Sequence, residues 1–96
     1  MKKKTLAIEF PHVFEPVVGQ IYENKNGISY LCRSVEHDCY GNYTRQAEFV
    51  SCSGWYLTAD CPRQYKDGQI EWDASYHGHF IELSDAMKMF TQAEKK

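Results

Sequence analysis

A chain of 96 residues, 43% hydrophobic and 25% charged, is long enough for one domain and too short for a second hydrophobic core. Five of the 11 basic residues lie at the chain ends, so residues 5–94 hold six basic and all 13 acidic side chains, a formal charge of -7 that argues against a nucleic-acid groove. No apolar run approaches the roughly 18 residues that a membrane-spanning helix needs, so we expect no membrane partner.

The four cysteines are expected to be reduced. The basic residues 2–4 resemble the start of a secretion signal, but Glu9 and Pro11 interrupt the apolar run that should follow. We therefore expect a cytoplasmic protein, whose reducing surroundings keep cysteines as free thiols that serve as small buried hydrophobic side chains. The cysteines are Cys32, Cys39, Cys52 and Cys61.

Short strands dominate the first half of the chain. Residues 6–10 alternate in polarity at the period of a half-buried strand. Residues 20–23 and 28–32 flank a segment with an Asn-Gly pair, a combination typical of a β-hairpin. The polar residues 36–44 predict an exposed loop.

The same strand pattern continues in the second half. Strands are expected over residues 47–52 and 55–59, and the intervening Ser53-Gly54 predicts either a tight turn or a glycine-marked bulge. Residues 65–70 predict a second hairpin with Asp-Gly at its tip. A final strand is expected over residues 79–83.

Residues 84–95 predict a C-terminal helix, because apolar side chains recur there at i, i+3, i+4 and i+7. This stripe consists of Ala86, Met89, Phe90 and Ala93. Ser84 suits the N-cap and Asp85 the first turn. So short a helix has to pack its stripe on the sheet or on a second copy of the chain, and a homodimer through the helix is one alternative.

These elements predict a single mainly β domain over residues 1–96. Residues 1–4 would form a flexible basic arm, residues 5–83 an antiparallel β-meander of five to seven strands, and residues 84–95 the helix. Both a small SH3-like barrel and a curled antiparallel sheet fit this pattern.

Histidine and cysteine pairs offer only weak signs of chemistry. On a strand, His77 and His79 would project from one face, but a third metal ligand is not evident and the cysteines lack the close pairs of zinc sites. Cys39 follows His37 closely, yet sequence neighbours seldom form a nucleophile and its base. We predict no enzyme, no bound metal and no cofactor.

The aromatic residues suggest a binding surface. If Trp55 and Trp72 point inward, several tyrosines remain partly outside among carboxylates, which suits a protein-binding surface better than a nucleic-acid one. The predicted surface consists of Tyr56, Tyr65, Glu71, Asp73 and Tyr76. Its partner would be a basic or nucleic-acid-binding protein. The alternative is a single-stranded nucleic-acid binder, in which the rings stack bases and Lys2, Lys3 and Lys4 supply charge.

The order S-G-W-x-L-T-A, Y-x-D-G-x-I-x-W-D-x-S and G-x-F resembles a group of small uncharacterised bacterial proteins carried by phages and integrative elements. The likeness spans residues 51–83, about a third of the chain. The matching residues are Ser53, Gly54, Trp55, Thr58, Ala59, Tyr65, Asp67, Gly68, Ile70, Trp72, Asp73, Ser75, Gly78 and Phe80. The resemblance implies a mobile-element setting and no established activity. By analogy it implies a non-catalytic protein-binding module that inhibits a host protein.

Overall fold

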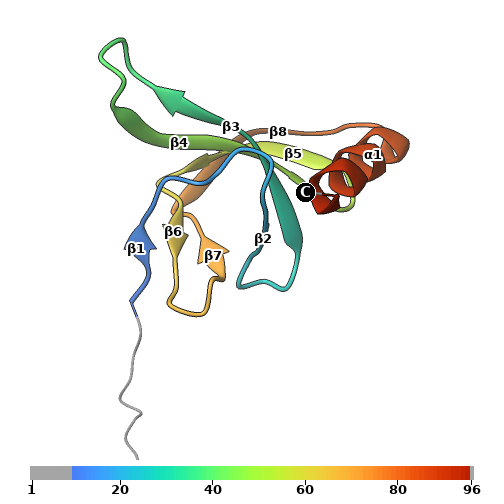
Figure 1. The fold of residues 1–96 in the computed structure, drawn as a ribbon, viewed down its shortest axis with the longest axis horizontal. Helices are drawn as coiled ribbons and strands as arrows, with labels where there is room; N and C mark the ends of the chain where they lie inside the picture. The colour runs from blue at the N-terminus through green and yellow to red at the C-terminus, as the bar shows by residue number, and fades with distance from the viewer. Residues whose placement is uncertain (1–9, 96) are drawn as a thin grey trace, which may run out of the picture.

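The computed structural model describes residues 10–95 and shows a mainly β fold with one C-terminal helix, as predicted (Figure 1). Within this range the strands are β1 (His12–Val13), β2 (Ile21–Glu23), β3 (Ser29–His37), β4 (Tyr43–Ser51), β5 (Trp55–Asp60), β6 (Arg63–Gln64), β7 (Ile70–Glu71) and β8 (Ala74–Phe80). The helix is α1 (Leu83–Glu94). The predicted arm over residues 1–4 and nearly all of the predicted strand over residues 6–10 lie outside the described residues.

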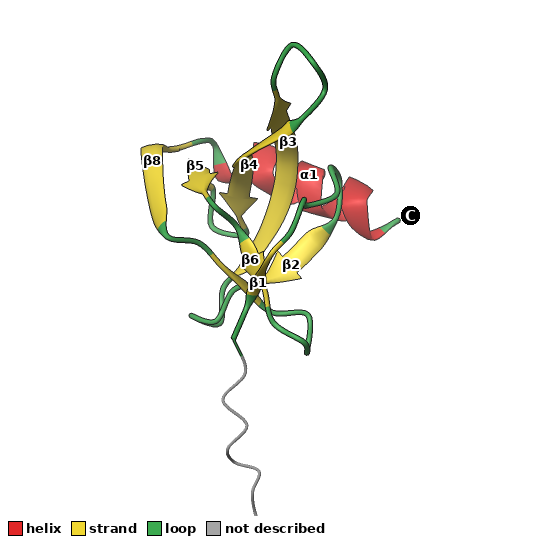
Figure 2. Cartoon of the chain, turned by 90° about the vertical axis from the view of Figure 1, so that its left-hand side faces the viewer, coloured by secondary structure: helices red, strands yellow, loops and turns green. Residues whose placement is uncertain are grey.

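Two antiparallel sheets make up the β part. The larger sheet has the order β2-β3-β4-β5-β8, and the smaller has the order β1-β6-β7 (Figure 2). The sheets do not close into a barrel. Residues 10–95 contain eight strands, whereas the sequence predicts five to seven. The higher number comes from β1, β6 and β7, which are only two residues long.

The larger sheet buries side chains on both faces. On the face toward the small sheet, Phe49 is fully buried and Trp72 stacks on it, with ring centroids 5.2 Å apart. Trp55 packs against the same cluster, so both tryptophans lie inward, as predicted. On the other face, α1 covers a cluster that contains Leu31 and Val50.

The helix packs its predicted apolar stripe on the sheet. Ala86 is fully buried against the cluster of Leu31 and Val50. The other three members of the stripe, Met89, Phe90 and Ala93, are partly buried against the same cluster. A dimer through α1 would therefore have to use its exposed side chains, such as Leu83 and Met87.

The turn predictions are confirmed, and the β4–β5 connection is a tight turn. The Gly54 amide donates to the Ser51 carbonyl at 3.0 Å, and the φ of +94° at Gly54 lies in the left-handed region that glycine favours. The predicted hairpin over residues 65–70 joins β6 to β7, and its Gly68 amide donates to the Tyr65 carbonyl at 3.0 Å.

Several element boundaries differ from the predictions. The last strand is β8, ending at Phe80, and not residues 79–83, because the chain turns there into α1. The N-cap is Glu82 instead of Ser84: the amides of Asp85 and Ala86 donate to the Glu82 carbonyl at 3.0 and 3.1 Å. The predicted loop over residues 36–44 is confirmed, although β3 and β4 extend into both of its ends.

The cysteines are all free, but only one is a buried hydrophobic side chain. Cys32 is fully buried in the core between the sheets, Cys61 is half-buried, and Cys39 and Cys52 are exposed. The expectation of four buried thiols is wrong for the exposed pair, because Cys39 lies in the β3–β4 loop and Cys52 in the β4–β5 turn. Among residues 10–95, no helix is both long and apolar enough to cross a membrane.

Candidate functional site

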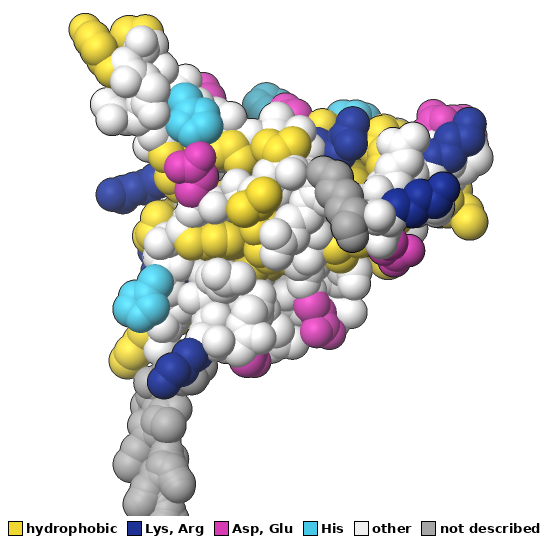
Figure 3. Space-filling view, in the orientation of Figure 1, with side chains coloured by type: hydrophobic (Ala, Val, Ile, Leu, Met, Phe, Trp, Pro, Cys, Tyr) yellow, Lys and Arg dark blue, Asp and Glu magenta, His cyan; other side chains and the backbone are white. Residues whose placement is uncertain are grey.

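The helix covers only one end of its face of the larger sheet. It packs where Ile21, Leu31, Val50 and Tyr56 form a cross-strand row, and the strands continue beyond it toward the β3–β4 loop (Figure 1). Histidine and acidic side chains project along this upper edge of the molecule in Figure 3. We call the part beyond the helix, with Tyr56 at its border, the open face.

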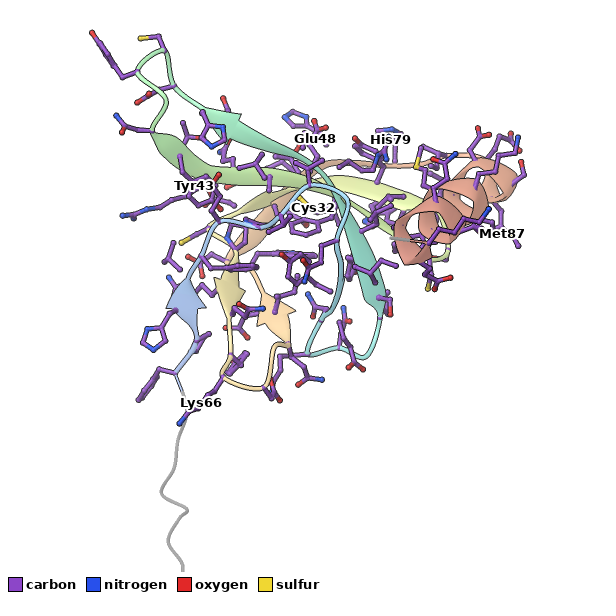
Figure 4. The ribbon with its side chains drawn as sticks, in the orientation of Figure 1. Cys32, Tyr43, Glu48, Lys66, His79 and Met87 are labelled. Atoms are coloured by element: carbon purple, nitrogen blue, oxygen red, sulfur yellow. The ribbon has the colours of Figure 1, made fainter. Side chains whose placement is uncertain are left out.

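Two rows of paired residues form the open face. The open face consists of Ser34, Glu48, Tyr56, Thr58, Tyr76 and His79. Glu48 lies two residues before the buried Val50 and therefore on the same side of the sheet. Its neighbours in register are Ser34, Thr58 and, one strand further, Tyr76. Figure 4 shows Glu48 and His79 on the same side of the sheet, away from the small sheet.

Hydrogen bonds fix the centre of the open face. The Tyr56 hydroxyl donates to Glu48 Oε1 at 2.9 Å, and the Ser34 hydroxyl donates to the same oxygen at 3.0 Å. The His79 ring stacks on Tyr56, with centroids 5.4 Å apart and an interplanar angle of 25°. Burial, together with the hydrogen bond to the Glu48 carboxylate, raises the pKa of Tyr56, so its hydroxyl remains a donor at neutral pH.

A shallow hollow of about 420 Å³ adjoins this network. Its lining includes the carboxylates Glu36 and Glu48, the hydroxyl of Thr58, and His77. Hydroxyl and carboxylate oxygens accept hydrogen bonds, so the hollow suits a cationic group better than an anionic one. A larger hollow of about 640 Å³ lies on the small sheet beside Tyr65 and Lys66, and no carboxylate lines it.

The five residues of the predicted binding surface do not form one patch. Tyr56 and Tyr76 belong to the open face. Tyr65 and Glu71 lie in the β6–β7 hairpin, where the Tyr65 hydroxyl donates to Glu71 at 2.8 Å. Asp73 precedes β8 and pairs with Arg63 at 3.1 Å.

The other three residues of that surface, Tyr65, Glu71 and Asp73, already contact side chains of the protein itself. The Lys25 ammonium lies 4.4 Å from the centroid of the Tyr65 ring, and Arg63 balances Asp73. Lys66, next to Tyr65, lies far from Glu48 and His79 in Figure 4. The open face is therefore the better candidate for an external partner.

His77 and His79 do not form the simple pair that their spacing predicts. His77 has a φ of +57°, and the β5–β8 register shifts between Tyr56 and Thr58, so the strand is irregular here. His79 Nδ1 lies 3.2 Å from the carbonyl oxygen of His77. Residues 10–95 contain no group of three or more side chains placed to hold a metal ion.

Sequence reasoning missed Glu48, Ser34 and His79 as members of the surface. An acidic residue between the apolar positions of a strand is an available signal for Glu48. Its partners, however, come from three other strands and follow only from the register.

Comparison of the chain with models of protein families, with curated proteins and with solved structures gave no match. The likeness to mobile-element proteins stays a prediction.

Proposed function

We propose that the protein is a non-catalytic protein-binding module, and that its open face binds a basic segment of another protein. The observation that carries this proposal is the uncovered double row of aromatic and hydrogen-bonding side chains beside a carboxylate-lined hollow. Tyrosine, which presents a large apolar ring and a polar tip, is enriched in protein interfaces. Tyr76, exposed at 47%, offers such a ring to a partner.

Charge favours a basic protein over a nucleic acid as the partner. Glu36 and Glu48 lie at the hollow and would repel phosphates. Arg33 adjoins Tyr56, but Lys25 and Arg63 are engaged on the small sheet. Of these three cations only Arg33 lies near the open face, and a single cation is not the cluster that binding to a phosphate backbone requires.

The resemblance to phage and mobile-element proteins supports a more specific form of this proposal. A small cytoplasmic protein that covers the basic surface of a host protein inhibits it by occupancy, without any chemistry of its own. Such an inhibitor acts stoichiometrically, and salt weakens its binding because the attraction is partly electrostatic.

A quantitative pull-down from bacterial lysate tests the proposal. Tyr76→Ala removes an exposed ring, and Glu48→Gln removes a charge but keeps an oxygen that can accept from Tyr56 and Ser34. We expect the wild type to recover a stoichiometric partner whose binding weakens with salt, and both variants to recover about tenfold less of it. Glu71→Gln on the small sheet is the matched control and should recover as much as the wild type.

Two results would count against the open face. Either no stoichiometric partner is recovered, or Glu71→Gln loses it as strongly as Glu48→Gln does. Filter binding of a single-stranded oligonucleotide at low salt tests the alternative function, nucleic-acid binding. If an oligonucleotide binds and the binding disappears when Lys2, Lys3 and Lys4 are removed, the nucleic-acid alternative replaces the protein-binding proposal.

A further inference from the structure

Strand β8 is an exposed edge of the larger sheet. It pairs with β5 on one side, and six of its seven residues are exposed. Proteins usually blunt such an edge with charged residues, proline or a β-bulge; β8 contains no charged residue or proline, and its one irregularity lies at His77, where φ is +57°. The opposite edge, β2, has only three residues, and the loop that follows it is tied to the small sheet by a hydrogen bond from the Lys25 amide to the Ile70 carbonyl at 3.0 Å.

The backbone of β8 presents hydrogen-bonding groups outward. The Ile81 amide donates to the Gly54 carbonyl at 2.9 Å and so points toward β5. Successive amides of an antiparallel strand alternate in direction, so the Phe80 amide points away from β5. Strand β8 ends the strand order of the larger sheet, so no described strand pairs with this donor and it is open to an added strand.

Acidic residues at both ends of β8 favour pairing with a basic segment over pairing with a second copy of β8. Asp73, whose carboxylate forms an exposed ion pair with Arg63 at 3.1 Å, directly precedes the strand, and Glu82 follows it by two residues. In an antiparallel pairing of two copies, Asp73 of each copy would lie near Glu82 of the other, and like charges would meet at both ends. An incoming segment with lysine or arginine at its ends would instead meet complementary charges.

We propose that β8 binds an extended segment of the partner protein as an additional strand, with a basic residue near each end of that segment. This inference rests on the proposed function and specifies how the partner is held. Asp73 and Glu82 lie nine residues apart, and a regular strand of that length spans about 30 Å, so the two basic side chains are at most about 30 Å apart. Tyr76 and His79, which form the outer border of the open face, would contact side chains of the added strand.

Fluorescence anisotropy with a labelled synthetic peptide tests this proposal on the full chain. The probe has seven alternating threonine and valine residues, to match β8, and a lysine at each end. Phe80→Pro removes the outward amide, whereas the matched Phe80→Ala removes the ring that packs on Trp55 but keeps the amide. We expect Phe80→Pro to bind the probe about tenfold more weakly than Phe80→Ala does.

Three results would overturn strand addition. The first is no binding of the probe at about 1 mM. The second is equal affinity of Phe80→Pro and Phe80→Ala. The third is undiminished binding of a probe whose terminal lysines are replaced by glutamates. If Phe80→Pro does not fold, hydrogen exchange on the wild type decides: saturation with the probe must slow exchange of the Phe80 amide about tenfold, and unchanged exchange overturns the proposal.

A pull-down from lysate with the Phe80 and Tyr76 variants distinguishes failure of strand addition from failure of the proposed function. If Phe80→Pro retains a partner that Tyr76→Ala loses, the open face stands and strand addition fails. If both variants lose it while Phe80→Ala and Glu71→Gln retain it, both proposals are supported.

Discussion

Gly78 shows how a single residue shapes the edge of the sheet. A Cβ built on Gly78 would lie 2.2 Å from the Trp55 ring, far inside contact distance. Trp55 cannot move freely, because Phe80 packs on it with ring centroids 4.7 Å apart. We therefore expect Gly78→Ala to lower the free energy of unfolding by about 1–3 kcal/mol, as measured by urea denaturation.

A double-mutant cycle isolates this clash. In a Trp55→Leu background the indole is gone, so Gly78→Ala should cost less than about 0.5 kcal/mol. Ser75→Ala, at an exposed position on the same strand, should be near neutral in either background. An equal cost of Gly78→Ala with and without the indole would show that the ring contact is not its cause.

At the scale of elements, α1 is held by one side of its surface. Phe90 packs against the cluster of Leu31 and Val50, whereas Met87 is 59% exposed and lies on the outer side of the helix (Figure 4). We expect Phe90→Ala to cost about 2–3 kcal/mol in urea denaturation, because it removes a large packed ring. Met87→Ala is the matched control and should change stability by less than about 0.5 kcal/mol. Equal losses in the two variants would contradict the observed packing of α1.

Local signals explain which elements the sequence predicts. The Asn-Gly and Asp-Gly pairs specify the tips of their hairpins without help from the rest of the chain, and both predictions are confirmed. Strand β1 lacks such a signal, since it forms only where His12 and Val13 meet β6. The end of β8 likewise depends on where α1 docks, which no local pattern encodes.

Only part of the candidate site can be predicted from the sequence, because the rest depends on which strands pair. Tyr56 and Tyr76 stand out as rings near the surface, and the structure places both on the open face. The sequence places Tyr65 and Glu71 close to them along the chain, yet these two residues lie in the β6–β7 hairpin of the separate small sheet. Glu48 becomes visible as a partner only when the register sets it beside Ser34 and near Tyr56.

At the scale of the whole molecule, burial of weak acids links stability to alkaline pH. Burial raises the pKa of Cys32 from 9.0 to about 11 and that of Tyr43 from 10.0 to about 12, and it also raises the pKa of Tyr22. Cys32 lies in the core between the two sheets in Figure 4. The folded protein therefore keeps these protons at a pH where the unfolded chain has released them.

Stability should consequently fall as pH rises. A raised pKa in the folded state gives a contribution that is fully present below the pKa of the unfolded chain and is lost as pH rises through the folded pKa. For Cys32 this interval runs from about pH 9 to about pH 11, and the loss amounts to roughly 2–3 kcal/mol. Urea denaturation at a series of pH values measures it. Cys32→Ala should flatten the decline in this interval, whereas Cys39→Ala, at an exposed thiol, should leave it unchanged. An identical decline in wild type and Cys32→Ala would show that other groups govern alkaline unfolding.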